Sequence, residues 1–234
     1  MASLESLKMR KYAAKGTIIQ RVGQDTPVAI KVKYIGTSTI TSVVVTTGTD
    51  IVFTTAAATD TIDFATYTTI GAVVDAINGT GRWQAMVVDA LRSAASVSRL
   101  FSATVTAATD EVGASVYNIK LDTSSGLQYA VCLSPFTNFD APKGHAVKLQ
   151  EIKYGINMTT PAVNSVQIWK RLGTVETQVF GGLSVDTTET TISWASGVGY
   201  IGGNVNEEII VLVKDAAQLD DATTNYIQVV GVIE

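Results

Sequence analysis

A single stretch of helical pattern among strand patterns constrains the fold of this chain most. Within residues 69–78, four apolar residues recur at the three-and-four spacing that places them on one side of a helix: Ile70, Val73, Val74 and Ile77. Thr68 or Thr69 is suited to cap the first turn, and Asn78-Gly79 supplies the left-handed residue that ends the helix. We therefore predict one amphipathic helix that lies on a sheet.

The residues around this helix have the alternating pattern of strands. Val28, Ile30, Val32 and Tyr34 alternate with less apolar residues, which indicates a strand with one buried and one solvated face. Short runs of the same kind, separated by turn residues, predict further strands at residues 40–46, 51–54, 62–64, 83–91, 100–106, 114–121 and 127–133. The first half is thus predicted to be a β-rich domain with one helix.

The second half shows no helical period. Its strand patterns fall at residues 146–156, 163–172, 175–180, 190–195, 208–214 and 225–233. Short strands at this spacing are typical of a β-sandwich or jelly roll. A turn-rich segment around Pro142, at residues 138–144, is the predicted boundary between the halves.

These patterns together predict a mainly β protein, of a β-rich α+β class. We expect a basic N-terminal arm at residues 1–25, a β-rich domain with one helix at residues 26–141, and a β-sandwich domain at residues 145–234. Charged residues make up 16% of the chain, against roughly 25% in an average protein. Low charge and high strand content favour association between strand edges, a property that an assembling protein can use.

Basic residues are concentrated near the amino end, although the whole chain has a net charge of −4. Residues 1–33 carry Glu5 and Asp25 against a larger basic set: Lys8, Arg10, Lys11, Lys15, Arg21, Lys31 and Lys33. Such an arm is either a solvated tail or a segment that docks on an acidic partner surface. We do not expect nucleic acid as the partner, because no recognised nucleic-acid-binding motif accompanies the charges.

The single cysteine, Cys132, excludes an intrachain disulfide. Its apolar neighbours favour a buried structural thiol over a nucleophile. No run of about eighteen apolar residues is present, and the charged start of the chain lacks the apolar segment of a signal peptide. We expect neither a membrane segment nor secretion.

No pattern predicts a catalytic, metal or cofactor site. His145 is the single histidine, so it has no second histidine for a metal site and no nucleophile motif for a catalytic relay. Three adjacent acid pairs fall in predicted turns or at a strand start, and we interpret them as solvated charge rather than as glycosidase carboxylates or a calcium site: Asp110-Glu111, Glu207-Glu208 and Asp220-Asp221.

Two further patterns favour packing over binding. Residues 197–203 match the spacing G-x-G-x-x-G, but a strand rather than a helix follows, so we predict a hairpin loop instead of a dinucleotide site. Trp83, Trp169 and Trp194 lie in separate predicted strands, which favours core or interface packing over a stacking platform.

One segment resembles a known class of proteins. The run IDFATYTTIGAVVDAIN, followed by a glycine turn and RWQAMVVDAL, is similar to the strand–helix–strand insertions of structural proteins in tailed-bacteriophage virions. The low charge, the abundance of Thr, Ala, Gly and Val, and the sandwich-like second half most resemble a capsid decoration, or cement, protein.

This resemblance implies a non-enzymatic protein that binds the outside of a phage capsid and stabilises it. It implies the major capsid protein or other virion proteins as partners, a homo-oligomer with a trimer favoured, and a location on the capsid surface after synthesis in the host cytoplasm. Lys8, Arg10, Lys11 and Lys15 are then expected to contact an acidic capsid surface. The alternatives are a tail, neck or head-fibre component, or a carbohydrate-binding adhesion module.

Overall fold

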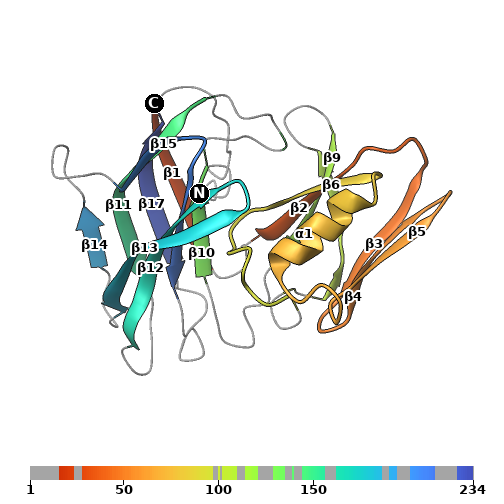
Figure 1. Cartoon of the computed structure of the whole chain (residues 1–234), viewed down its shortest axis with the longest axis horizontal. Helices are drawn as coiled ribbons and strands as arrows, with labels where there is room; N and C mark the ends of the chain where they lie inside the picture. Colours follow the sequence, from red (N-terminus) through yellow and green to blue (C-terminus); the bar gives the residue numbers. More distant parts are fainter. Residues whose placement is uncertain are drawn as a thin grey trace, which may run out of the picture. The chain divides into compact units, whose positions relative to one another are not determined.

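The structure, a computed structural model, describes residues 16–23, 28–96, 100, 102–109, 114–120, 129–134, 139, 144–155, 162–185, 190–193, 201–213 and 226–233. Within these residues the chain consists mainly of antiparallel sheets, with one helix (Figure 1). The predicted mainly β fold class is confirmed.

The chain divides into two compact units, one of which is inserted in the other. Val28–Ser125 form the inserted unit, and Met1–Pro27 with Gly126–Glu234 form the terminal unit. This division corrects the predicted boundary at residues 138–144. Its cause is strand pairing: the strand at Tyr129–Leu133, which we expected in the first domain, pairs with Glu208–Val213 in the second.

The inserted unit contains two four-stranded antiparallel sheets and the helix. The first sheet has the order β6-β2-β9-β8, and the second has the order β5-β4-β3-β7. In chain order its elements are β2 (Val28–Tyr34), β3 (Ile40–Thr46), β4 (Asp50–Thr55), β5 (Thr59–Asp63), α1 (Ile70–Gly79), β6 (Trp83–Val87), β7 (Ala103–Thr104), β8 (Ala107–Thr109) and β9 (Ser115–Lys120). The strands predicted at residues 83–91 and 100–106 are therefore shorter than expected, and β8 was not predicted.

Aromatic side chains join both sheets of the inserted unit in one core. Trp83 is buried, with its ring centroid 4.7 Å from that of Tyr34 and 4.6 Å from that of Phe53. Tyr117 meets the same indole edge-on at 6.1 Å. Because Phe53 belongs to one sheet and the other three residues to the second, the cluster fixes how the two sheets face each other.

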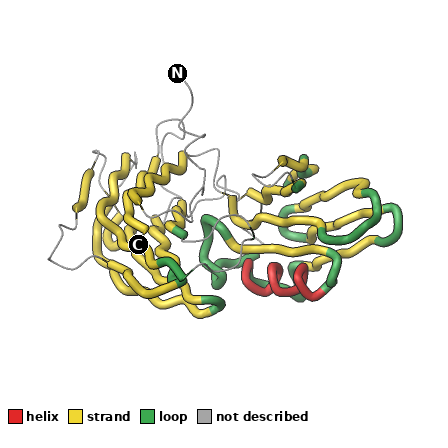
Figure 2. Tube along the Cα trace, turned by 90° about the horizontal axis from the view of Figure 1, so that it is seen from above, coloured by secondary structure: helices red, strands yellow, loops and turns green. Residues whose placement is uncertain are grey.

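The predicted helix is confirmed, and its apolar stripe is buried against the sheets. Figure 2 shows α1, in red, alongside the strands of its own unit. Ile70, Val73, Val74 and Ile77 are all buried in this core. Burial of each such side chain contributes about 1.5–3 kcal/mol to folding.

A loop and a threonine complete the start of α1. Thr69 is the N-cap: its hydroxyl oxygen accepts a hydrogen bond from the Ala72 N–H at 3.2 Å. The Gly71 N–H donates to the Arg92 carbonyl oxygen at 2.8 Å. The Arg92 guanidinium also donates to Asp75 at 2.6 Å, so the loop holds the first two turns of the helix.

The end of α1 differs from the prediction. Gly81, with a φ of +69°, is the left-handed residue, whereas Thr80 remains in the right-handed region. Asn78 has another role: its side chain accepts from the Ala85 N–H at 2.7 Å and donates to the Ala85 carbonyl at 3.1 Å. The amide thus joins the helix to β6, and the turn is made two residues later than expected.

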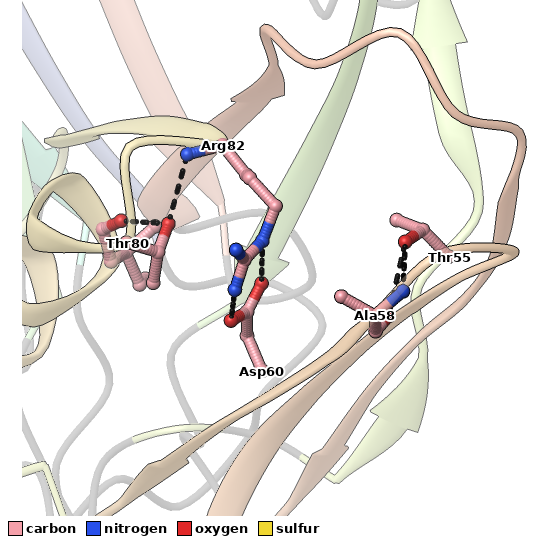
Figure 3. Close-up of polar contacts among 6 residues, drawn as sticks. Thr55, Ala58, Asp60, Thr80 and Arg82 are labelled. Carbon is pink, nitrogen blue, oxygen red and sulfur yellow. Dashed lines mark hydrogen bonds and ion pairs between the residues drawn. The ribbon is translucent and has the colours of Figure 1, made fainter.

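The turn after α1 is also tied to the second sheet. The Arg82 guanidinium forms a two-pronged ion pair with the Asp60 carboxylate of β5, with Nε donating to Oδ2 at 2.9 Å (Figure 3). The hydrogen bond and charge of Asp60 raise the pKa of Arg82 above its ordinary value. This pair links the α1–β6 turn to an outer strand.

Two glycines of α1 provide a matched test of this packing. A Cβ at Gly71 would lie 2.9 Å from Arg92 Cβ and 3.0 Å from the Arg92 carbonyl oxygen, whereas a Cβ at Gly79 meets open space. Alanine is favoured over glycine in helices by about 1 kcal/mol, so Gly79→Ala should leave stability unchanged or raised. Gly71→Ala should lower the urea midpoint of unfolding. Equal midpoints for the two variants would contradict the proposed contact.

The terminal unit also has two antiparallel sheets. One has the order β1-β17-β11-β14, with β15 also paired to β11, and the other has the order β10-β16-β12-β13. Its strands are β1 (Gly16–Gly23), β10 (Tyr129–Leu133), β11 (Ala146–Gly155), β12 (Ala162–Leu172), β13 (Val175–Val185), β14 (Thr190–Ser193), β15 (Ile201–Val205), β16 (Glu208–Val213) and β17 (Tyr226–Ile233).

Glycines allow close contact between the two sheets of this unit. A Cβ at Gly231 would lie 2.7 Å from Leu133 Cδ1, and a Cβ at Gly202 would lie 2.6 Å from Ile209 Cδ1. Gly231 and Gly202 belong to one sheet, and their neighbours to the other. The sheets therefore pack face to face, while the strand order does not confirm the jelly-roll part of the prediction.

Strand β17 lies between the two strands β1 and β11. It pairs with β1 from Gly16↔Ile233 to Gly23↔Tyr226, and with β11 on its other side. This corrects the bounds of the predicted arm at residues 1–25, because Gly16–Gly23 belong to the sheet.

Removal of residues 227–234 should prevent the terminal unit from folding, because β1 would lose its described ladder partner and β11 would lose one of its partners. We expect a marked loss of the β signal in circular dichroism and aggregation of the chain. Removal of Glu234 alone, which lies outside β17, is the control and should be harmless. A well-folded chain lacking residues 227–234 would contradict the central role of β17.

Candidate functional site

The arm residues Lys8, Arg10, Lys11 and Lys15 lie outside the described residues. The residue that follows them, Gly16, is the first residue of β1 and is paired with Ile233. β1 itself is paired with β17 along its whole length. The residue that directly follows the arm, Gly16, is thus held in a sheet of the terminal unit.

The hairpin formed by β12 and β13 carries exposed apolar side chains near its turn. Leu172 is 53% exposed, Val175 is 66% exposed and Val179 is 42% exposed. Leu172 and Val175 are opposite each other in the ladder, so they share one face of the hairpin. Single exposed apolar residues are ordinary, but three on one hairpin indicate a contact surface.

The turn of this hairpin is set by one glycine. Gly173 has a φ of +61°, and Thr174 does not have a positive φ. A two-residue loop with the left-handed residue in first position is a type II′ turn, whose twist matches that of the flanking strands. The apolar residues are therefore presented by a regular hairpin.

A buried row of charges crosses three strands directly behind the turn. Arg171 of β12 is opposite Glu176 of β13 and Glu208 of β16. Its Nε donates to Glu208 Oε2 at 2.6 Å, and its Nη1 lies 3.4 Å from Glu176 Oε1. Arg171 is 2% exposed, so this is a buried network rather than a surface pair.

The predicted buried thiol is confirmed and belongs to the same network. Cys132 Sγ lies 3.5 Å from Glu208 Oε1 and 3.6 Å from Arg171 Nη2. Burial by itself would lower the pKa of Arg171, but Glu208, Cys132 and Glu176 together raise it above its ordinary value. The guanidinium therefore remains charged throughout the accessible pH range.

Glu207 and Glu208 are buried, which corrects their interpretation as solvated turn charge. Glu207 Oε1 accepts from the Asn204 side-chain amide at 3.0 Å. Its Oε2 lies 3.3 Å from Lys170 Nζ, close enough for ionic attraction, yet it has no hydrogen bond of good geometry. The pair is better described as an ionic contact than as a hydrogen bond.

The remaining candidates have structural positions. The His145 carbonyl oxygen accepts from the Asn206 N–H at 2.7 Å, within the turn before β16. Trp83 is a core residue, and the Trp169 indole N–H donates to Gln167 Oε1 at 3.0 Å. Three predicted features lie outside the described residues: Asp110-Glu111, Asp220-Asp221 and Trp194.

The glycine-rich match at residues 197–203 is also corrected. Its last three residues belong to β15 rather than to a hairpin loop, and the others lie outside the described residues. A Cβ at Gly202 would lie 2.4 Å from the Val147 carbonyl oxygen. This glycine therefore serves close packing between strands, with no space left for a pyrophosphate at that point.

Sequence reasoning missed the hairpin surface and its charge row. The available signal was the segment Arg171-Leu172-Gly173-Thr174-Val175-Glu176, in which apolar and then opposite charges flank a glycine turn symmetrically. Such symmetry predicts an apolar cross-strand pair next to the turn and an ion pair beyond it. The third residue of the charge row, Glu208, is far from Arg171 in the sequence, and no sequence pattern predicted that the two residues pair.

Searches with the sequence provide no family for this chain: no family model matches it, and no curated protein matches it. Within the described residues, no helix is long and apolar enough to cross a membrane. Across the same parts of the chain, no group of three or more His, Cys, Asp or Glu side chains is arranged to hold a metal ion.

Arg171→Met should destabilise the protein by about 3–5 kcal/mol, because it leaves Glu208 and Glu176 buried without their cation. The double variant Arg171→Met with Glu208→Leu should recover much of this loss, since one buried carboxylate is also removed. Urea unfolding of both variants measures the difference. Equal losses in the two would show that the charge row is not the cause.

Proposed function

We propose that this chain is a non-enzymatic structural protein of a tailed-phage virion. It binds the outside of the capsid, as a decoration or cement protein does. The resemblance, which covers roughly residues 40–105, suggests this class. The exposed apolar residues of the β12–β13 hairpin and the basic residues next to β1 support an assembly role. Its partners are then the major capsid protein or other virion proteins, and its location is the capsid surface.

The observation that carries the proposal is that the basic arm is joined directly to a strand that is paired in a sheet. Lys15 directly precedes Gly16, and β1 is paired with β17 along its whole length. An arm that begins at a rigid sheet can reach an adjacent acidic surface while its own unit stays folded. The basic side chains of the arm would add charge-assisted contacts whose strength depends on salt.

Capsid stabilisation by such a protein needs no chemistry. A molecule that binds the assembled shell and not its dissociated subunits stabilises the shell by mass action. The apolar residues Leu172 and Val175 on the β12–β13 hairpin offer a second, less salt-dependent contact. The two kinds of contact would make binding weaker, but not absent, at high salt.

Replacement of Lys8, Arg10, Lys11 and Lys15 by Glu should weaken co-sedimentation with candidate tailed-phage capsid shells. We expect the loss to be largest at low salt, because ionic contacts are strongest there. The measurement is the bound fraction at several salt concentrations.

The matched control exchanges Lys and Arg at the same four positions, which keeps the charge and should keep binding. Unchanged binding of the Glu variant would overturn the role of the arm. Binding to isolated tails or necks in place of capsids would assign the chain to a tail, neck or head-fibre component.

A further inference from the structure

β13 is the outer strand of its sheet as far as the described residues show. Among the described strands it has β12 as its one ladder partner. From Val175 to Gln178 the pairing is regular, and a bulge at Val179 follows. Val175, Thr177, Gln178 and Val179 are all exposed.

This edge has two of the features that normally prevent strands from associating, a bulge at Val179 and the inward-directed charge of Glu176, but it lacks others. Its residues 175–179, Val-Glu-Thr-Gln-Val, contain neither proline nor lysine. The single charge, Glu176, is directed at Arg171, and its side chain is 6% exposed. By contrast, the outer strand β5 of the inserted unit carries the exposed acid Asp63.

The segment is also complementary to itself. In an antiparallel pair centred on Thr177, Val175 lies opposite Val179 of a second copy, and Glu176 lies opposite Gln178. Apolar residues then meet apolar residues, Thr meets Thr, and no like charges oppose each other. Because each residue pair occurs twice about the two-fold axis, the contact is closed and limited to two copies.

We propose that β13 pairs with β13 of a second copy of this chain, in an antiparallel register centred on Thr177, to form a two-fold dimer. The pairing joins two four-stranded sheets into one continuous sheet. Leu172, beside the turn, adds apolar surface at each end of the contact. The inference does not depend on capsid binding, and it differs from the trimer that the resemblance implies.

Val179→Lys tests the interface directly. It places a lysine on the exposed edge, opposite Val175 of the partner copy, and should raise the dimer dissociation constant by about tenfold or more. The mass in solution, measured by sedimentation, should be twice the chain mass of 24.7 kDa for the unchanged protein and fall toward the monomer for the variant. Ile35→Lys makes the same change at an exposed site of the inserted unit and should leave the mass unchanged.

Thr177→Cys tests the register. Two copies of residue 177 meet at the axis, so mild oxidation should join them through a disulfide. Thr61→Cys, on an exposed position of β5, is the control and should not crosslink, and buried Cys132 should not crosslink in the unchanged protein. A monomer at all concentrations, a trimer insensitive to Val179→Lys, or equal crosslinking of the two cysteine variants would overturn the proposal, whatever the outcome with capsids.

Discussion

The pairing of β17 with both β1 and β11 is the constraint on which the rest of the terminal unit depends. It places β1, near the start of the chain, and β17, near its end, in one sheet. The inserted unit, Val28–Ser125, is formed by the chain between β1 and the remaining strands of the terminal unit. Because the ladder is long-range, this sheet closes only when the last residues of the chain are available.

The charge row of Arg171 has a different role from the apolar core. Burial of three ionised side chains gains little net stability, since the cost of removing them from water offsets their attraction. The row instead specifies the register of three strands, because Arg171 lies opposite both Glu176 and Glu208 in this register. A shift by one residue would turn the arginine to the other face and leave the carboxylates unpaired, so the row opposes register slips at the base of the hairpin.

Local sequence patterns predicted the helix and most strands correctly, but they did not predict contacts between residues that are far apart in the sequence. The helix and the strand at Val28–Tyr34 follow from periodicity, because side-chain direction is set by local geometry. The domain boundary was wrong because a turn with Pro142 is also compatible with a connection inside one unit. Glu207 and Glu208 were misread because adjacent acids are ordinarily solvated, and the partner that buries Glu208 is not near it in sequence. The end of the helix was misplaced because Asn78 bonds to β6 instead of adopting a left-handed conformation.

The surface features of the terminal unit separate into two physical classes. The contacts that we propose for the basic arm would be ionic and would therefore weaken as salt is added. The contacts that we propose for the edge of β13 would be backbone and apolar, and they would depend far less on salt. A protein with both can associate with its own copies through one and with an acidic partner through the other, independently. Since Glu176 is paired with Arg171 inside the hairpin, its charge is neutralised and does not oppose strand pairing at the edge of β13.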